Sequence, residues 1–367
     1  MSEFRFFMPT DTYFGKGCVM EHKDVLKKLG KTAMLVTGRH SAKANGSQRD
    51  VTAALDAVGI PWILFDEVGE NPDIETVVRA AEIAKKENVE FIIGIGGGSP
   101  MDASKAIAVL AANATETADI LFTQKQARAL PVAEVPTTAG TGSEVTQYAI
   151  MTLHEKRTKS GIVQPIFAKV SFLDPTYMDT LSAKNTNNTA VDAMSHLVES
   201  YLSARANEMS RKLTEIGLSY WKECIPALKK REYTKETREK LMLASAMGGV
   251  VIAQTSTSLP HGLGYFLTYE KGIPHGRANG MLMQAYMELF GKEDENVKNV
   301  LHALGLESTE EMGQLMKELL DITEAFTEED VLYYAKRMME TPQKLATFPA
   351  FALTEQDVQN IYRKSLL

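Results

Sequence analysis

One carboxylate and three imidazoles in the second half of the sequence could together hold a metal ion. Asp192 and His196 lie four residues apart, so on a helix they share one face. His261 and His275 follow, and each stands directly before a glycine. An isolated Asp–His pair at this spacing is more often a surface hydrogen bond, but two further histidines favour a metal site. Three imidazoles and one carboxylate suit Fe²⁺ or Zn²⁺.

Two glycine-rich segments in the first half could bind an anionic ligand. The run GIGGGSPMD, residues 94–102, follows a strand pattern and opens a helix, so its backbone can approach a ligand and offer free N–H groups. A tight turn with no ligand would use the same residues. Ser99 replaces the last glycine of a GxGxxG fingerprint, so the ordinary Rossmann motif is absent. The hydroxyls of PTTAGTGSEVT, residues 136–146, could bind phosphate, ribose or nicotinamide, or cap a helix.

The elements that must position these segments fall into two halves. In the first half, short apolar runs alternate with helical patterns such as Asp73–Glu87, which predicts βαβ units and a parallel sheet. The apolar runs are Ala33–Thr37, Pro61–Phe65, Phe91–Ile95 and Pro131–Val135. After about Pro175 helical patterns take over, at Asn188–Arg205, Glu208–Glu223, Lys235–Gln254, Glu310–Leu320 and Glu328–Met339. We expect an α/β domain over residues 1–178 and a mostly α-helical domain over residues 179–367.

Composition narrows the class of protein. The chain has 367 residues and a net charge of −7, which argues against nucleic acid or an anionic membrane as the main partner. Its two cysteines, Cys18 and Cys224, are far apart, so neither a disulfide framework nor a thiolate zinc site is expected. The N-terminus lacks a signal-peptide pattern, and the longest apolar region, Met242–Ala253, is too short to span a bilayer. We therefore expect a cytoplasmic protein.

Taken together, the motifs resemble the iron-containing alcohol dehydrogenase family. The resemblance runs from FFMPTDTYFG to about Gly280, and its segments are GGGSPMDASKA, EVPTTAGTGSEVT, FLDP, DAMSHLVESYLS, HGLGY and IPHGRANG. It implies the dehydroquinate synthase-like fold of that family, with an N-terminal dinucleotide-binding domain, a helical metal-binding domain and an active-site cleft between them. It also implies a homodimer or larger homo-oligomer that interconverts small alcohols or diols with aldehydes or ketones, using NAD(P)(H).

The resemblance carries over residue by residue. The family's metal ligands match Asp192, His196, His261 and His275. Its diphosphate and nicotinamide contacts match Gly97, Gly98, Ser99 and Asp102. Its further cofactor contacts match Asn71, Thr137, Thr138, Lys159 and Leu181.

The sequence departs from the family at two positions. Tyr265 stands where many members carry a second histidine in an HxxxH arrangement. Tyrosine could pass a proton there, although its reference pKa of about 10 makes this harder at neutral pH, and a relay through solvent or ribose is equally open. Gly38 stands where NAD-preferring members often have a carboxylate that binds the ribose 2′-OH and repels a 2′-phosphate. Because Arg39, Ser41 and Lys43 could bind a phosphate, unless the basic pair is merely solvated, we predict a preference for NADP(H), with NAD(H) possible.

The predicted mechanism is direct hydride transfer between a carbinol carbon and the nicotinamide, with the metal as Lewis acid. His261, His275 and Tyr265 are the predicted catalytic residues. Two alternatives stay open. A glycerol dehydrogenase-like or dehydroquinate synthase-like enzyme would use the same scaffold, and a non-catalytic nucleotide-binding protein could keep the fold. The complete ligand set and the TTAGTGSEVT run favour the alcohol dehydrogenases.

Overall fold

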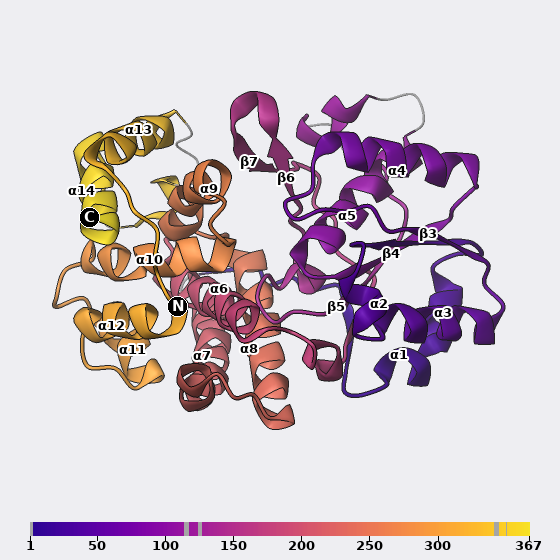
Figure 1. Cartoon of the computed structure of the whole chain (residues 1–367), viewed down its shortest axis with the longest axis horizontal. Helices are drawn as coiled ribbons and strands as arrows, with labels where there is room; N and C mark the ends of the chain where they lie inside the picture. Colours follow the sequence, from indigo (N-terminus) through magenta and orange to yellow (C-terminus); the bar gives the residue numbers. More distant parts are fainter. Residues whose placement is uncertain (1–2, 114–116, 124–126, 341–344, 350) are drawn as a thin grey trace. The chain divides into compact units, whose positions relative to one another are not determined.

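The computed structural model describes residues 3–113, 117–123, 127–340, 345–349 and 351–367 (Figure 1). The chain divides into an α/β unit, Met8–Leu181, and a helical unit, Ser182–Leu367, which also includes Met1–Phe7. Gln254 ties the N-terminal segment to the helical unit, since its side chain accepts from the N–H of Phe7 at 3.0 Å and donates to its carbonyl at 2.9 Å. An α/β half followed by a helical half is the fold class that the sequence predicts.

A six-stranded parallel sheet forms the centre of the α/β unit. Its order is β1-β8-β5-β4-β2-β3, and every neighbouring pair is parallel. The strands are β1 (Asp11–Phe14), β2 (Ala33–Thr37), β3 (Trp62–Phe65), β4 (Phe91–Gly96), β5 (Val132–Pro136) and β8 (Val170–Leu173). The four apolar runs of the sequence became β2 to β5, whereas β1 and β8 were not predicted.

Helices cover both faces of this sheet, which explains why its inner strands are apolar without interruption. Figure 1 shows α4 (Ile74–Lys86) and α5 (Gly98–Ala112) on one side of the strands, and α1 (Cys18–Glu21), α2 (Ser41–Ala44) and α3 (Ser47–Val58) on the other. Two separate hydrophobic clusters result, one with α4 and α5 and the other with α1 and α3.

An antiparallel hairpin projects from the chain after β5. Its strands are β6 (Ile150–Leu153) and β7 (Thr158–Gly161), and it is anchored beside the start of α4 because the N–H of Thr152 donates to the carbonyl of Pro72 at 2.8 Å. Short 3-10 helices occur at Lys23–Lys28, Ala118–Phe122, Ser143–Val145, His154–Lys156, Pro175–Met178 and Leu345–Thr347.

Nine helices make up the described part of the helical unit, apart from its one 3-10 turn. They are α6 (Ala183–Leu202), α7 (Glu208–Lys230), α8 (Lys235–Thr255), α9 (Leu259–Lys271), α10 (His275–Glu288), α11 (Glu295–Leu304), α12 (Thr309–Leu320), α13 (Glu328–Met339) and α14 (Glu355–Leu366). The central helix is α6, which is buried over most of its length and packs against α7, α8 and α10.

The helix boundaries follow from local chemistry. The hydroxyl of Ser182 accepts from the N–H of Asn185 at 3.2 Å, which starts α6 five residues before the predicted helix. Asn207 and Ser210 form a capping box that starts α7, and the helix continues through Pro226 to Lys230. The glycine-rich segment 260–280, for which the sequence predicted no helix, forms most of α9 and the start of α10.

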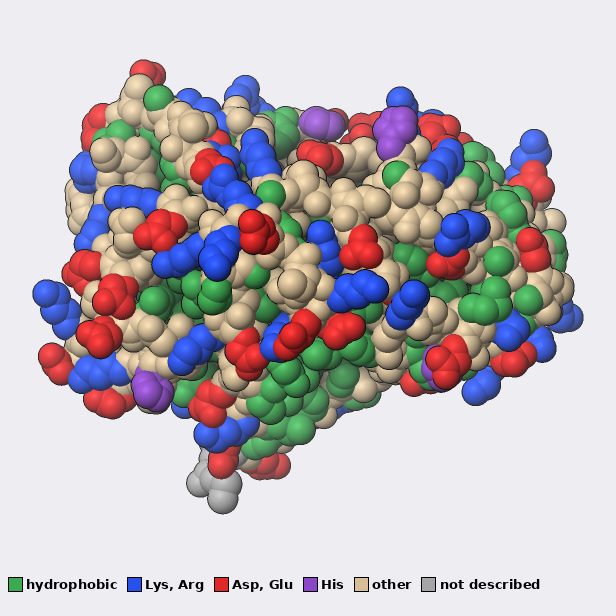
Figure 2. Space-filling view, turned by 60° about the horizontal axis from the view of Figure 1, so that its bottom comes forward, with side chains coloured by type: hydrophobic (Ala, Val, Ile, Leu, Met, Phe, Trp, Pro, Cys, Tyr) green, Lys and Arg blue, Asp and Glu red, His purple; other side chains and the backbone are tan. Residues whose placement is uncertain are grey.

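No single helix in the described ranges is long and apolar enough to cross a membrane. Helices α8 and α9 reach the required length and composition only as a pair, and the pair is bent by 110° at its break. On the face of the molecule in Figure 2, basic and acidic side chains alternate over the surface.

Candidate metal centre and cofactor-binding loops

The four proposed metal ligands converge inside the helical unit. Asp192 and His196 lie on the same face of α6, His261 lies in the first turn of α9, and His275 is the first residue of α10. Asp192, His196 and His261 are at most 4% exposed. The side chain of His275 is 22% exposed, so the cluster is more accessible to solvent at His275 than at its other residues.

The donor atoms are close enough to share one ion. The Nε2 atoms of His261 and His196 are 2.8 Å apart, and Asp192 Oδ1 lies 3.6 Å from His261 Nε2 and 3.9 Å from His275 Nε2. Donors of Asp192, His261 and His275 all lie within 4.8 Å of one another. Two ligands bound to the same Fe²⁺ or Zn²⁺ ion at about 2.0–2.2 Å can be at most about 4.4 Å apart. The distances from Asp192 to His261 and His275 lie within this limit, and the donor chemistry fits such an ion; His196 joins this group through its distance to His261.

Glycines let the ligand-bearing helices approach one another. A Cβ atom on Gly276 would lie 2.0 Å from the carbonyl oxygen of Asn188 and 2.7 Å from the Cβ of Asp192. A Cβ atom on Gly248 of α8 would lie 3.3 Å from the Cβ of His196. The glycine after His275 is thus required for close packing between α10 and α6, not for a turn.

Two further residues, which the sequence analysis did not single out, contact the ligands. Glu199 is fully buried; its Oε1 lies 2.5 Å from Nδ1 of His261, and its Oε2 accepts from the backbone N–H of Ser258. A carboxylate at the far nitrogen fixes the orientation of a ligand histidine. The amide nitrogen of Asn279 lies 3.0 Å from Asp192 Oδ1, 3.2 Å from His261 Nε2 and 3.3 Å from His275 Nε2.

The electrostatics of the cluster favour an ionised carboxylate. Burial alone would raise the pKa of Asp192, but the charges of His196 and His275 and the hydrogen bond from His261 together hold it below its ordinary value. For His261, burial works against protonation, but Glu199 and Asp192 outweigh it and raise its pKa to about 9. Without an ion, His261 is therefore in its doubly protonated imidazolium form at neutral pH.

Tyr265, the residue that departs from the family pattern, lies beside this cluster. Its ring stacks on the ring of His275, with 5.3 Å between centroids and an interplanar angle of 24°. The ring of His275 in turn meets that of His261 edge-on at 5.0 Å.

In the α/β unit, the two glycine-rich turns pack directly on each other. Gly97 caps α5, and a Cβ atom on it would lie 3.3 Å from the hydroxyl of Thr138. A Cβ atom on Gly98 would lie 2.7 Å from the methyl of Thr141. The N–H of Thr137 donates to the carbonyl of Gly96 at 2.8 Å. The proposed cofactor residues of the two turns are thus neighbours.

Buried polar contacts beneath the turns hold them together. Lys105 of α5 is fully buried, and its Nζ donates to the carbonyls of Ser143, Thr146 and Tyr148 at 2.6–2.9 Å. Asp102 accepts from the hydroxyl of Ser143 at 2.6 Å and from the N–H of Ile150 at 2.8 Å. Sequence reasoning missed Lys105, although a lysine within an otherwise apolar helix is a signal for a buried role.

Three other proposed cofactor residues, Asn71, Ser99 and Lys159, meet beside the hairpin. The backbone N–H of Asn71 donates to the hydroxyl of Ser99 at 3.1 Å. The Nζ atom of Lys159, in β7, donates to the side-chain oxygen of Asn71 at 2.8 Å. Asn71 has a φ of 57°, a conformation that asparagine tolerates better than most residues. Leu181 lies at the end of the unit, and no hydrogen bond within the described ranges joins it to the other proposed cofactor residues.

Gly38, Arg39 and Ser41 follow the carboxyl end of β2. Arg39 and Ser41 are exposed, and Ser41 opens the short helix α2.

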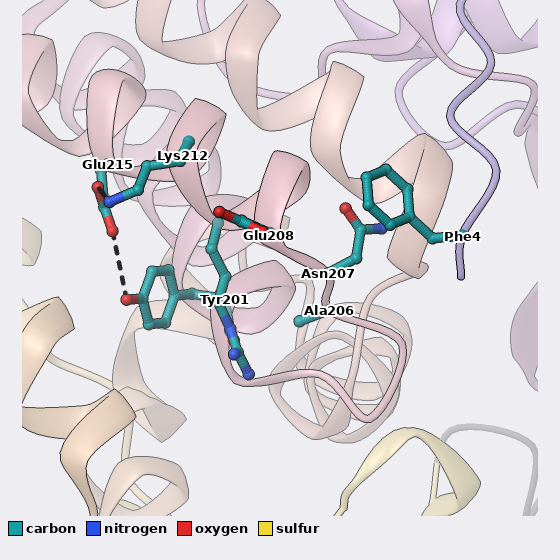
Figure 3. Close-up of a pocket in the computed structure, with 8 residues that line it drawn as sticks. Phe4, Tyr201, Ala206, Asn207, Glu208, Lys212 and Glu215 are labelled. Carbon is teal, nitrogen blue, oxygen red and sulfur yellow. Dashed lines mark hydrogen bonds and ion pairs between the residues drawn. The ribbon is translucent and has the colours of Figure 1, made fainter. Parts of the chain in front are cut away.

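A pocket of about 340 Å³ lies elsewhere in the helical unit (Figure 3). Its lining includes the N-terminal segment and the start of α7, and the residues are Phe4, Tyr201, Ala206, Asn207, Glu208, Arg211, Lys212 and Glu215. The hydroxyl of Tyr201 donates to Glu215 at 3.4 Å across one side of it. None of the proposed ligands or cofactor residues lines this pocket.

Comparison with known proteins decides the family. Residues 9–175 match the model for iron-containing alcohol dehydrogenases, and residues 186–366 match the model for the C-terminal part of the same family. The chain belongs to the iron-containing alcohol dehydrogenase family. It is thus a nicotinamide-linked alcohol dehydrogenase, and the non-catalytic alternative is set aside.

Individual relatives cover nearly the whole enzyme. A solved iron-containing alcohol dehydrogenase of Thermotoga maritima is 37% identical, with a TM-score of 0.91 over 99% of both chains. NADH-dependent butanol dehydrogenase A of Clostridium acetobutylicum is 30% identical over 89% of this chain and 86% of its own. NADPH-dependent butanol dehydrogenase of Clostridium saccharobutylicum is 27% identical over 97% and 89%, respectively. The dehydrogenase is therefore similar to enzymes named for either nicotinamide cofactor.

Proposed function

We propose that this alcohol dehydrogenase acts on small alcohols or diols, and on the matching aldehydes or ketones, with Asp192, His196, His261 and His275 holding one Fe²⁺ or Zn²⁺ ion. The convergence of the donors of Asp192, His261 and His275 within 4.8 Å carries this proposal. One carboxylate and three imidazoles suit these ions.

When bound, the ion supplies Lewis acidity toward the substrate oxygen, and the nicotinamide supplies or accepts the hydride. The residues of the chain provide position and charge. Glu199 engages Nδ1 of His261, which leaves Nε2 directed at Asp192 and the ion site. Tyr265, stacked on His275, is our candidate for passing a proton to or from the substrate.

In the α/β unit, the start of α5 is the proposed diphosphate site. Backbone N–H groups of Gly97 and Gly98 lie at a helix N-terminus, where an anion is favoured. The other proposed cofactor contacts are Asn71, Ser99, Asp102, Thr137, Thr138, Lys159 and Leu181. The contacts among Asn71, Ser99 and Lys159 support their assignment to one site.

The proposed cofactor preference is for NADP(H) over NAD(H). Gly38 carries no carboxylate, and Arg39 and Ser41 are exposed beside it and can donate to a 2′-phosphate. Comparing kcat/KM for NADP and NAD checks this preference, and a clear advantage for NAD contradicts it.

His261→Ala tests the metal centre, because His261 contacts both Asp192 and His196. Protein reconstituted with Fe²⁺ or Zn²⁺ is assayed for bound metal and for turnover of butanol, propanediols and glycerol with both cofactors. We expect metal and turnover to be lost together. His302→Ala, at an exposed position on α11, is the matched control and should retain both. Full activity in His261→Ala contradicts the ligand assignment.

We also propose a cytoplasmic homodimer or larger homo-oligomer, with no nucleic acid or membrane partner. Light scattering on the purified chain tests the oligomeric state, and a monomer at micromolar concentration contradicts it.

A further inference from the structure

The chain that leaves β3 runs directly against Gly38, at the end of β2. The two strands are parallel neighbours, and Val36 pairs with Phe65. Beyond this pair, the N–H of Val68 donates to the carbonyl of Thr37 at 3.2 Å, and a Cβ atom on Gly38 would lie 3.3 Å from the carbonyl of Val68. Residues 66–68 therefore border the place where the adenosine ribose would be recognised.

Asp66 brings a carboxylate to this border. It accepts from Nζ of Lys43 at 2.7 Å, in a pair whose side chains are 36% and 50% exposed, respectively. The hydrogen bond from Lys43 and, to a smaller extent, the charge of Arg39 hold the pKa of Asp66 below its ordinary value. Asp66 is thus ionised at neutral pH. It forms an ion pair with Lys43, which is one of the cations expected to bind a 2′-phosphate.

We propose that Asp66 is a specificity-determining residue, which limits binding of the 2′-phosphate and supplies the carboxylate that Gly38 lacks. This inference rests on the proposed cofactor site. A 2′-phosphate must take Lys43 from Asp66 and also meets the negative charge of Asp66, and both effects weaken NADP(H). A ribose 2′-OH, in contrast, can donate to the same carboxylate, so Asp66 does not lower the affinity for NAD(H). The NADP(H) preference from Arg39 and Lys43 is therefore partly offset by a neighbouring strand.

The test compares Asp66→Asn with the unmodified full chain, using two probes that differ only at the 2′ position. These are adenosine 5′-monophosphate and adenosine 2′,5′-bisphosphate, and their dissociation constants are measured by calorimetry at low ionic strength, where exposed charges act most strongly. Asp66→Asn should tighten the bisphosphate relative to the monophosphate by about fivefold, the scale of an exposed charge pair. In steady-state kinetics, the kcat/KM ratio of NADP to NAD should rise in parallel.

Glu67→Gln is the matched control, because it removes the adjacent carboxylate, which faces Arg79 at 3.4 Å and not Lys43. Lys43→Met should weaken the bisphosphate and make the Asp66→Asn effect smaller, since one of its two causes is gone. A probe ratio within twofold of wild type in Asp66→Asn, or an equal change in Glu67→Gln, overturns the inference while the cofactor site stands. If neither probe binds the unmodified chain, the cofactor site itself is wrong and the inference falls with it.

Discussion

Replacing Glu199 with glutamine should weaken metal binding without changing the shape of the core. The carboxylate accepts two hydrogen bonds from buried donors, one from the backbone N–H of Ser258 and one from Nδ1 of His261. A glutamine amide has one acceptor oxygen and one donor group. If the oxygen serves Ser258, the NH₂ group faces His261 and favours the tautomer with its proton on Nε2. That nitrogen can then no longer bind an ion.

If the oxygen instead serves His261, the N–H of Ser258 faces another donor. The second arrangement leaves the buried N–H of Ser258 unsatisfied, which costs about 1–3 kcal/mol, and the first arrangement costs the ion one of its ligands. Loss of such an outer carboxylate lowers metal affinity about 10- to 100-fold, or about 1.4–2.8 kcal/mol, in the same range. Because His261 also contacts Asp192 at 3.6 Å, the loss should extend to the neighbouring ligand.

The assay is competition for Fe²⁺ or Zn²⁺ against a chromophoric chelator, with circular dichroism of the metal-free protein as a check on folding. Glu215→Gln is the matched control, since Glu215 is a partly exposed carboxylate on α7 that binds Lys212 at 2.8 Å. Its metal affinity should equal that of wild type. If Glu199→Gln binds metal within twofold of wild type and remains folded, Glu199 does not orient His261, and this reasoning is refuted.

Three other perturbations follow from the same contacts. Gly276→Ala places a methyl 2.0 Å from the carbonyl of Asn188, so it should cost about 3 kcal/mol in urea unfolding and abolish metal binding; wild-type stability would contradict the packing. Lys105→Met removes the ammonium group that donates to three carbonyls and lies 3.9 Å from buried Glu134. The free energy of unfolding should therefore fall by about 3 kcal/mol, and binding of adenosine 5′-monophosphate should weaken. Unchanged binding would show that the turns hold their form without Lys105. Because the pKa of His261 is raised to about 9, an ion must displace its proton at lower pH. Apparent metal affinity should therefore rise about tenfold per pH unit from pH 7 and level off near pH 9, and a flat profile measured by chelator competition would contradict this.

The sequence predicted β2 to β5 from short apolar runs. β2 has the predicted bounds, Ala33–Thr37, because it is covered on both faces and has β4 and β3 on its two sides. β1 escaped prediction because it is an edge strand, DTYF, whose residues are mostly exposed and show no apolar run. β6 and β7 form a separate two-stranded sheet and are partly exposed, and the sequence of β7, TKSG, contains no apolar run. β8, VSFL, was missed although it is buried at every position, so burial alone did not decide which strands could be predicted.

Helix ends and several whole helices, α9 and α10 among them, were harder to predict. The helical pattern from Glu208 was predicted to end at Glu223, yet α7 continues through Pro226 to Lys230. Gly264, Gly276 and Gly280 lie in the segment 260–280, for which no helix was predicted. In the structure they allow close helix packing, which single-sequence periodicity does not distinguish from a break.

In the candidate site, the proposed ligands were visible as residue types, whereas their supports were not. Glu199 lies seven residues after Asp192 and three after His196, so it shares their helix face, a spacing that could have revealed it. Asn279 lies four residues after His275 by the same rule. Both are polar side chains at buried positions of apolar helices, but only the fold shows which ligand each one contacts.

The small residues around the cluster explain how four ligands from three helices come so close. A Cβ atom on Gly264 of α9 would lie 2.6 Å from Oδ1 of Asn279, so this glycine leaves room for the amide that contacts Asp192, His261 and His275. Gly276 does the same for α10 against α6. The ligand types determine which ions the cluster can hold, but the separation of the donors depends on how near the helix backbones approach. A substitution at either glycine should therefore impair the metal site while every ligand is still present in the sequence.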